Sequence, residues 1–593
     1  MIEQIKRLGF EKNHETFIWT KETFQNFSYS DGDRTENYLL DSIRSCGDRS
    51  TASFEIRKFI KDWPSLYHLS RRRANILRPF VPILKGKTVL EIGCGCGALS
   101  RYLGEIGANL IAVEGSPRRA LITRERCREL VNVEVVNATS EMVSGLIDFD
   151  IVILNGVLEY SPMFLGKNGP LDLLKNSFDQ LNDQGALIVA IENQLGLKYF
   201  AGQPEDHANY PMYGINDSYR DGEFRTWGRK ELEALIYSAG FHEIEQYIPL
   251  PDYKLPVSIV TPDGWRNFQS ELNQLAVNSV NNDPQNTPHY VFSLERSYQS
   301  IWKNNLAADL ANSFLMIAYK GIQKKIPHSN ALAYHFVDDM KIGFNHGFEI
   351  FLEGSDIKVK VFPLDGDSTE KFDQGNLSAK KFLFEGNHWL GLLQILNRVG
   401  WTEKEVIEWA RIWIFSIQEK AGLSGDACLD ATVDGAFWDM IPQNAFRDKF
   451  GKFLFLGQEI QRKEKVTFGS VLFHGLMGSF QKVSSVGTFH KSAPVSLLNL
   501  TQAVFGEIFR FQIDDFFLSR FESEQAKIIA ESFESINFDK SKNNKFLEQR
   551  NPISEYKVKI EALEKIITDI YGSTSWKITA PFRKIIAFFK KFK

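Results

Sequence analysis

Short apolar runs alternate with helical patterns along the first half of the chain. Each run is rich in Val, Ile and Leu and is bounded by Gly or polar residues, which is typical of strands buried on both faces. The strand candidates are residues 88–92, 109–113, 133–136, 149–154, 186–191 and 242–250, with a last strand at 312–321. Helical patterns at 99–106, 117–130 and 225–241 separate several of them. This order predicts an α/β fold with a parallel sheet and helices on both faces.

A glycine-rich turn lies between the first strand and the first helix. Gly93, Gly95 and Gly97 stand at alternate positions in "EIGCGCGALS". Glycine tolerates positive φ and lets bare backbone approach a ligand, while the following helix offers free N–H groups. Glu114 ends the second strand, close to the place where a nucleotide-binding unit puts a carboxylate on ribose hydroxyls.

Two ligands compete for this turn. A dinucleotide is allowed, because Gly93, Gly95 and Ala98 also satisfy G-x-G-x-x-A. Glu91 argues against it, since a carboxylate before the glycines repels a pyrophosphate and attracts a cation. S-adenosylmethionine carries an ammonium and a sulfonium. The stretch resembles the class I methyltransferase family, whose first motif is E/D-x-G-x-G-x-G. The resemblance implies a Rossmann-like seven-stranded sheet, S-adenosylmethionine as cofactor and Glu114 at its ribose.

Ligands of open α/β sheets bind at the carboxyl ends of the strands, so the residues that follow the strands are the informative ones. The family often has an acidic residue after the third strand, where this chain has "NAT" at 137–139, and an amide or backbone contact would replace it.

The helical segment 63–80 is expected to close over the cofactor. The expected cofactor-binding residues are Glu91, Gly93, Gly95, Gly97, Glu114, Ser116, Ala138, Thr139, Asn155, Tyr67 and Arg73.

The catalytic candidates follow the fourth and fifth strands. Residues 149–160 match the family motif that borders the reacting methyl group, and related sequences that bind a metal or use an imidazole have His where this chain has Tyr160. No metal is therefore expected. An alcohol acceptor needs a base, for which the candidates are Glu159, Glu192, Asp206 and His207. We favour His207, because its free pKa lies nearest neutrality, and each of the four has the alternative of a hydrogen-bonding or positioning role.

Composition narrows the setting. The 593 residues carry a net charge of −4, which gives no general attraction to nucleic acid. Five scattered cysteines favour a reducing compartment, and Cys94 and Cys96 are expected to be small fillers of the turn. The sequence has neither a signal peptide nor an 18-residue apolar run, so we expect a cytoplasmic protein that does not span the membrane.

The second half has a different pattern, with a hairpin at 348–364 followed by helices, which predicts an α+β domain. Asp439 and Asn444 keep the D-x-x-x-x-N spacing of kinase-like phosphotransferases, with Lys358 or Lys360 as the phosphate-pairing lysine. Phe437 replaces the expected His, no glycine-rich loop precedes the lysines, and "LGQE" stands where a metal-binding Asp should begin. A non-catalytic, degenerate kinase-like domain is therefore favoured.

The C-terminal part consists of a polar linker, a heptad pattern and a basic end. Apolar residues recur at gaps of three and four between Ile553 and Ile570, which favours a short coiled coil for a homo-oligomer or for polysaccharide-assembly enzymes. After Pro581, Phe and Ile share one helical face and Arg and Lys the other, as in helices that lie on an anionic membrane surface. Packing of that helix on the protein's own core is the alternative. The segment also resembles the S-W-R-x-T-x-P-L-R ending of bacterial polysaccharide glycosyltransferases.

Over residues 60 to 520 the chain resembles bacterial cell-surface polysaccharide (O-antigen or capsule) methyltransferases. The resemblance implies methyl transfer to a sugar hydroxyl or terminal phosphate of a lipopolysaccharide or other glycan, at the inner face of the cytoplasmic membrane. Two alternatives remain: a membrane-associated scaffold with a vestigial cofactor site, and a bifunctional methyltransferase–phosphotransferase. The expected division is an N-terminal cap at 1–62, the methyltransferase domain at 63–325 with an insertion at 251–311, the α+β domain at 326–535 and the tail at 536–593.

Overall fold

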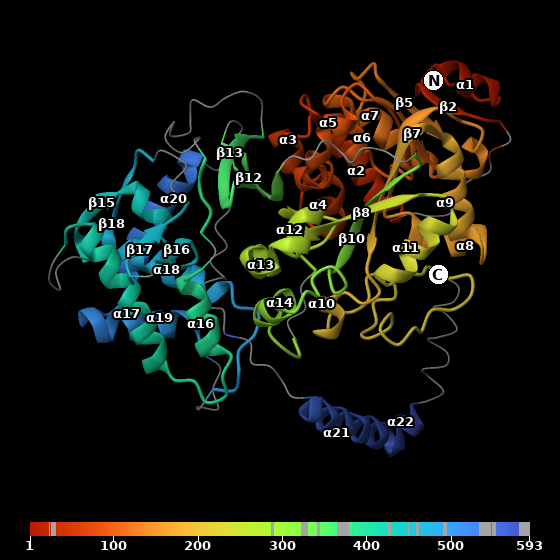
Figure 1. The fold of residues 1–593 in the computed structure, drawn as a ribbon. Coiled ribbons are helices and arrows are strands. Elements are labelled where there is room, and N and C mark those ends of the chain that lie inside the picture. Colours follow the sequence, from red (N-terminus) through yellow and green to blue (C-terminus); the bar gives the residue numbers. More distant parts are fainter. Residues whose placement is uncertain are drawn as a thin grey trace.

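The computed structural model describes residues 1–22, 24, 31–285, 290–321, 330–340, 344–364, 379–383, 385–423, 429–448, 450–457, 462–489, 495–532, 547 and 553–579. Figure 1 shows two lobes side by side, with β12 and β13 between them and the helices α21 and α22 apart from both.

A continuous sheet of fourteen strands runs through the described residues. In spatial order the strands are β1 (Glu11–Lys12), β2 (Ile18–Thr20), β5 (Val133–Asn137), β4 (Asn109–Glu114), β3 (Thr88–Ile92), β6 (Phe149–Asn155), β7 (Leu181–Glu192), β10 (Ser313–Tyr319), β8 (Glu243–Leu250), β9 (Ser258–Val260), β11 (Ala331–Val337), β12 (His346–Glu353), β13 (Asp356–Pro363) and β14 (Lys380–Lys381). The seven strands from β5 to β8 confirm the predicted α/β sheet. Strands β5, β4, β3, β6 and β7 are parallel, and β10 lies antiparallel between β7 and β8.

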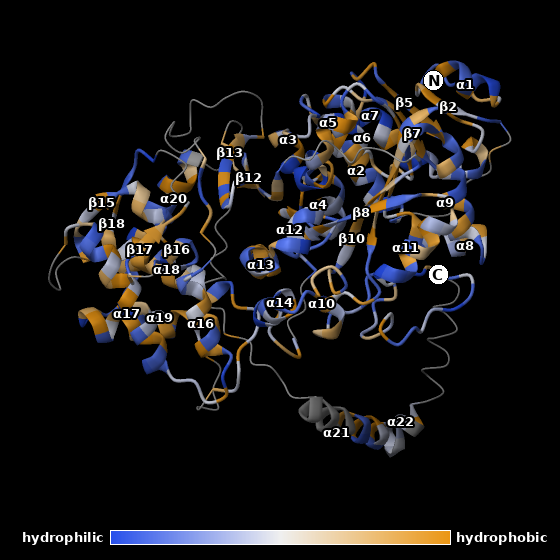
Figure 2. Cartoon of the chain, in the orientation of Figure 1, coloured by the Kyte–Doolittle hydropathy of each residue, from blue (hydrophilic) through white to orange (hydrophobic). Residues whose placement is uncertain are grey.

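Both faces of this sheet are buried. Successive residues of β3 point to opposite sides, so that Val89 belongs to one hydrophobic core and Leu90 to another. The surrounding helices carry both hydrophobic and hydrophilic residues (Figure 2). They are α1 (Ile2–Arg7), α2 (Asp33–Ser45), α3 (Phe54–Arg57), α4 (Trp63–Leu69), α5 (Val81–Leu84), α6 (Ala98–Glu105), α7 (Pro117–Arg126), α8 (Ser161–Leu165), α9 (Gly169–Gln180), α10 (Leu197–Phe200) and α11 (Arg229–Ser238), with short 3-10 turns η1 (Arg71–Ile76), η2 (Arg78–Phe80), η3 (Glu141–Val143) and η4 (Leu158–Tyr160).

The single helix predicted over residues 63–80 is wrong. Helix α4 ends at Leu69, because Ser70 is extended (φ −66°, ψ 134°) and its hydroxyl accepts a hydrogen bond from the Arg72 amide at 3.2 Å. Ser70 thus caps the next turn, η1, instead of continuing the helix. The break directs η1 across the carboxyl edge of the sheet.

The segment between β8 and β10 folds over that edge. It contributes β9, which extends the sheet, and the helices α12 (Pro262–Asn267), α13 (Gln269–Ser279) and α14 (Leu294–Lys303) with the turn η5 (Val280–Asn282). Strand β10 therefore occupies the position predicted for the last strand, with the inserted segment before it.

The second lobe contains the predicted hairpin, β12 and β13, and a largely helical body. Its helices are α16 (His388–Leu396), α17 (Glu403–Lys420), α18 (Phe468–Gln481), α19 (Leu497–Phe509) and α20 (Asp515–Ser532). Two small antiparallel pairs accompany them: β15 (Thr432–Asp434) with β18 (Lys465–Thr467), and β16 (Ala445–Arg447) with β17 (Phe453–Phe455), joined by the turns η7 (Gly435–Asp439) and η8 (Pro442–Asn444). Buried tryptophans such as Trp389 and Trp413 fill the core between the helices.

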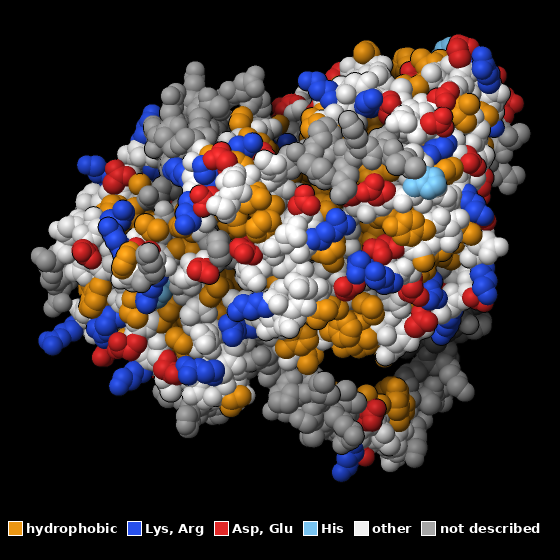
Figure 3. Space-filling view, in the orientation of Figure 1, with side chains coloured by type: hydrophobic (Ala, Val, Ile, Leu, Met, Phe, Trp, Pro, Cys, Tyr) orange, Lys and Arg blue, Asp and Glu red, His pale blue; other side chains and the backbone are white. Residues whose placement is uncertain are grey.

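The tail contains α21 (Ile553–Gly572) and α22 (Thr574–Ile578). On α21, Leu563, Ile567 and Ile570 are about half exposed. The basic segment after Pro581, with its predicted membrane-binding helix, lies outside the described residues, as does almost all of the polar linker. No helix in the described part of the chain has the length and apolar character needed to cross a membrane. On the face shown in Figure 3, Lys and Arg are interspersed with Asp and Glu.

A buried ion pair joins η1 to the end of β11. Arg72 Nε donates to Asp338 Oδ1 at 3.1 Å, and Asn75 Nδ2 donates to Asp338 Oδ2 at 2.7 Å. Asp339 pairs with Arg72 as well. The Asp338 side chain is 1% exposed, so its charge depends on these partners.

We expect Asp338→Ala to lower the free energy of unfolding by about 3–5 kcal/mol, because it leaves the Arg72 charge and the Asn75 amide without their buried partner. Thermal and urea unfolding of the full chain would measure the loss. Asp356→Ala, at the exposed start of β13, is the control and should change stability by less than about 0.5 kcal/mol. Equal stability of the two variants would contradict the structural role of the pair.

Candidate active site

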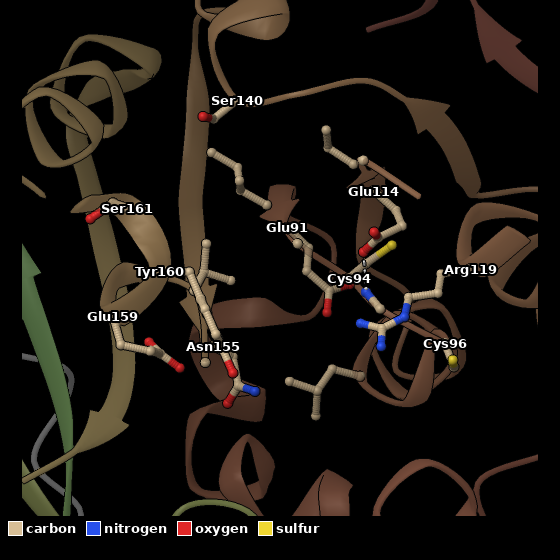
Figure 4. A pocket seen from close by; sticks show the side chains of 18 of the residues that line it. Glu91, Cys94, Cys96, Glu114, Arg119, Ser140, Asn155, Glu159, Tyr160 and Ser161 are labelled. Carbon is tan, nitrogen blue, oxygen red and sulfur yellow. Dashed lines mark hydrogen bonds between the residues drawn. The ribbon is translucent and has the colours of Figure 1, made fainter. Parts of the chain in front are cut away.

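A cavity of about 400 Å³ lies at the carboxyl ends of β3, β4, β6 and β7. Figure 4 shows Glu91 and Glu114 entering it from neighbouring strands, with Asn155 and Glu159 on the opposite side. The position is the one that open α/β sheets use for ligands. Nine of the eleven expected cofactor-binding residues line it: Glu91, Gly93, Gly95, Glu114, Ala138, Thr139, Asn155, Tyr67 and Arg73.

The glycine turn forms the floor of the cavity. Gly93, Gly95 and Gly97 all have positive φ, at 71°, 58° and 74°. A Cβ on Gly95 would meet no atom within 4 Å and would project into open space, whereas a Cβ on Gly93 would lie 2.6 Å from Val157 Cγ2. The turn therefore presents bare backbone at Gly95 and tolerates no side chain at Gly93 without a shift.

Glu114 and Glu91 are both buried beside this turn. The Glu114 carboxylate accepts hydrogen bonds from the amides of Gly95 and Ser116, each at 2.8 Å, and Glu91 accepts one from the Ser100 hydroxyl at 2.5 Å. Burial raises the pKa of Glu114 and raises that of Glu91 to about 7. A cationic ligand would offset this burial cost at Glu91 by favouring its ionised form.

Two expected cofactor residues do not line the cavity. Gly97 begins helix α6, where a Cβ would lie 2.9 Å from Thr123 Cα. Ser116 begins α7, where its amide orients Glu114. Gly97 and Ser116 therefore affect the ligand site through the backbone conformation at the starts of these two helices. Asn137 likewise turns away, because its amide donates to the carbonyls of Glu114 and Gly115.

The segment before β3 covers the cavity. The Arg73 guanidinium lies over the Tyr67 ring, 4.3 Å from its centroid, and donates to the Lys254 carbonyl at 2.9 Å. Next to it, His68 Nε2 lies 2.8 Å from Asp31 Oδ2, and Arg119 pairs with the same oxygen at 2.7 Å. The cover is thus fixed on one side by the N-terminal segment and on the other by the inserted segment.

The three residues favoured for catalysis come together on the opposite side. Glu159 lies on η4 after β6, Glu192 ends β7, and His207 lies in the loop after α10. One donor or acceptor atom from each lies within 4.8 Å of the others. Glu159 and Glu192 are each 1% exposed, and the Oε2 atom of each has no hydrogen-bond partner in the described part of the chain.

Their charges depend on one another. Burial and the neighbouring Glu192 raise the pKa of Glu159 to about 8. Burial would also raise the pKa of Glu192, but the Lys254 ammonium, 2.7 Å from Glu192 Oε1, outweighs it and lowers that pKa. Burial would lower the pKa of His207, yet Glu192 and its hydrogen-bond partner Glu205 raise it to about 9. Near neutrality the cluster therefore contains an imidazolium, an ionised Glu192 and a proton on Glu159.

These charges argue against His207 and Asp206 as the catalytic base. His207 is charged at neutral pH, so the argument from its free pKa no longer favours it as the base. Asp206 lines the cavity but pairs with Lys198 at 2.8 Å and with Lys254 at 3.3 Å, which hold its pKa low. The spacing of Glu159, Glu192 and His207 would admit a divalent cation, but Lys254 and the imidazolium already supply positive charge there.

Sequence reasoning missed several lining residues, among them Asp31, Trp63, Arg119, Tyr253 and Lys254. None of these residues belongs to a recognisable motif directly after a strand of the parallel sheet. The available signal for Tyr253 and Lys254 was the insertion predicted at 251–311, in which no individual site residue was expected.

The other sequence candidates have structural partners. Cys94 and Cys96 are buried free thiols whose pKa burial raises. Asp439 forms a two-point ion pair with Arg462, at 2.7 and 3.0 Å, and Asn444 donates to the Asp439 carbonyl. Lys358 and Lys360 pair with Glu353 and Glu349 on the β12–β13 hairpin.

The cavity fits S-adenosylmethionine. Glu91 suits a cationic amino acid portion, Glu114 keeps lone pairs for ribose hydroxyls, and the open side of Gly95 admits a ligand against the backbone. Asn155 Oδ1 is buried without a donor, which a bound molecule would supply. Arg73 offers a positive charge for a carboxylate.

Comparisons with known proteins agree with this fit. Residues 66–246 match the model of a methyltransferase domain family. The chain is 31% identical over 178 residues to a ubiquinone biosynthesis O-methyltransferase of Azorhizobium caulinodans, covering 29% of this chain and 64% of that protein. It is 28% identical over 112 residues to the mitochondrial ubiquinone biosynthesis O-methyltransferase of Schizosaccharomyces pombe, covering 18% of this chain and 38% of that one. The chain thus spans less than two thirds of either relative.

Among solved structures, phosphoethanolamine N-methyltransferase 2 of Haemonchus contortus, in complex with S-adenosyl-L-methionine, is 18% identical with a TM-score of 0.26, covering 42% of this chain and 52% of that one. The match over residues 66–246 and the seven-stranded sheet with its glycine turn together identify a methyltransferase domain with the Rossmann-like fold of the class I S-adenosylmethionine-dependent methyltransferases.

Proposed function

We propose that the protein transfers a methyl group from S-adenosylmethionine to a hydroxyl oxygen of a bacterial surface polysaccharide or its precursor. The observation that carries the proposal is a single cavity with the cofactor-binding turn on one side and the Glu159–Glu192–His207 cluster on the other. Methyl transfer requires acceptor oxygen, methyl carbon and sulfur in line, and an alcohol acceptor also requires a base.

The cofactor supplies an electrophilic methyl group on sulfur. As the acceptor oxygen bonds to that carbon, the carbon–sulfur bond breaks and its electron pair stays on sulfur. We assign the acceptor proton to Glu159 Oε2, because this atom is buried without a partner and its carboxyl has a pKa of about 8. His207 then acts beside it as a positioning group, with its ring held by Glu205 at 3.0 Å.

The acceptor side favours a hydroxyl over a terminal phosphate. Among the residues that the structure describes, buried oxygens of Asn155, Glu159 and Glu192 have no donor, so a ligand with several O–H groups would satisfy them. The nearby cations Lys254 and Lys198 are both committed to carboxylates. The His207 imidazolium is likewise paired with Glu205, so a phosphate would compete with carboxylates for each of these positive charges.

The polysaccharide context rests on the resemblance of the chain over residues 60–520 and of its basic end. We extend the proposal to a peripheral position at the cytoplasmic membrane through that end, and to partners held by the coiled-coil segment. The exposed apolar side chains Leu563, Ile567 and Ile570 of α21 support a contact surface there. A phosphotransferase activity of the second lobe is not favoured, since Arg462 occupies both oxygens of Asp439.

Gly95→Arg should weaken S-adenosylmethionine binding at least about 100-fold, or by about 2.7 kcal/mol, because the side chain would fill the cofactor's space. Isothermal titration calorimetry with the purified full chain measures the change. Gly107→Arg is a matched control, since Gly107 also has positive φ and open space but lies outside the cavity. Unaltered binding by Gly95→Arg would refute the cofactor site.

Glu159→Gln should lower kcat by about 100- to 10,000-fold with little change in cofactor affinity, as expected for the loss of a base. In the wild type, kcat should rise with pH and level off above about 8, because the raised pKa keeps the carboxyl protonated below that value. Asp172→Asn, which removes an exposed carboxylate on α9, serves as the control. Glu159→Gln with wild-type kcat across the pH range would contradict the assignment.

Surface glycans from cells lacking the gene should lose the mass of one methylene per modified sugar, as measured by mass spectrometry. Purified protein with S-adenosylmethionine should restore that mass to the isolated glycan, and blocking the terminal phosphate should leave the gain unchanged. Dependence of the gain on a free phosphate would instead identify phosphate as the acceptor.

A further inference from the structure

The inserted segment places two consecutive side chains on one carboxylate oxygen of the cluster. Tyr253 donates its hydroxyl to Glu192 Oε1 at 3.1 Å, and the Lys254 ammonium lies 2.7 Å from the same atom. Glu192 Oε2 has no hydrogen-bond partner among the described residues. The inserted segment thus contacts Glu192 through these two side chains, whereas Glu159 faces the cavity.

Lys254 is itself held from several directions. Its amide donates to Asp252 Oδ1 at 2.8 Å, its carbonyl accepts from Arg73 at 2.9 Å, and its ammonium lies 3.3 Å from Asp206 Oδ2. The side chain is 11% exposed. These contacts fix the ammonium between the cofactor cover and the catalytic cluster.

Two adjacent buried carboxylates cannot both ionise without a compensating charge. Lys254 is the cation on Glu192, and the structure shows no such ammonium on Glu159 among the described residues. The groups that face the pair are His207, Asp206 and Glu205 from the loop after α10, Tyr67 and Arg73 from the cover, and Tyr253 and Lys254 from the insertion.

We propose that Lys254 is a positioning residue for methyl transfer: it holds the negative charge on Glu192, so that Glu159 is the member of the pair that exchanges the acceptor's proton. This inference rests on the proposed function. In this proposal the inserted segment sets the protonation state of the site. The two glutamates themselves come from other elements, Glu192 from the end of β7 and Glu159 from the turn η4.

Removing the ammonium should raise the affinity of the pair for its proton. Lys254→Met should therefore shift the midpoint of the kcat–pH profile upward by at least about one unit, since the cation no longer favours the ionised pair. Lys254→Gln keeps a hydrogen-bonding amide but no charge, and it should shift the midpoint of the kcat–pH profile in the same direction. It replaces the methionine variant if that variant does not fold. Lys254→Arg should keep the midpoint near that of the wild type.

Lys198→Met is the matched control. Lys198 is a fully buried lysine that pairs with Asp206 at 2.8 Å and Asp252 at 3.3 Å, and no ion pair joins it to Glu192 in the described part of the chain. Its loss should leave the midpoint within about 0.3 unit, since the direct Lys254–Glu192 pair persists. Equal shifts in the Lys198 and Lys254 variants, or a loss of rate at every pH without a shift, would overturn the proposal.

Infrared spectroscopy supplies a readout that does not depend on turnover. At pH 7 the wild type should show a protonated carboxyl band that Glu159→Gln removes, and in Lys254→Gln a protonated band should persist to higher pH. Retention of the full band in Glu159→Gln would refute the assignment. If the wild type transfers no methyl group while these bands behave as stated, the proposed function fails and the role of Lys254 in charge placement stands.

Discussion

Burial of negative charge is the constraint around which the ligand site is built. Glu91, Glu114, Glu159 and Glu192 all lie at the carboxyl edge of a sheet whose two faces are filled with aliphatic side chains. In such surroundings a carboxylate needs hydrogen bonds, a cation or a proton. The four glutamates meet this need differently, and those differences divide the cavity into a cofactor side and an acceptor side.

On the cofactor side the backbone supplies the compensation. Glu114 is held by two amides of neighbouring turns, and Glu91 has one hydroxyl donor and a raised pKa, which leaves it suited to a cationic ligand. On the acceptor side, Lys254 compensates Glu192 and a proton compensates Glu159. Under the proposed function, the same physical problem prepares one end for binding a cation and the other for moving a proton.

Segments outside the parallel sheet complete the site. The η1 turn and the inserted segment meet over the cavity through Arg73 and Lys254, and Arg72 ties η1 to the end of β11. The second lobe is therefore joined to the cofactor cover by a buried ion pair as well as by the continuous sheet.

The sequence alone determined the sheet, the glycine turn and the carboxylates at its strand ends, because strand periodicity, glycine spacing and the position after a strand are local properties. The prediction of one helix over residues 63–80 was wrong. The Ser70 cap replaces helical continuation only when tertiary contacts hold η1 in place. Tertiary structure alone brought Lys254 to Glu192 and Glu205 to His207. Those contacts set which group holds the proton, because the pKa of a buried group depends on neighbours that the chain brings in from distant segments.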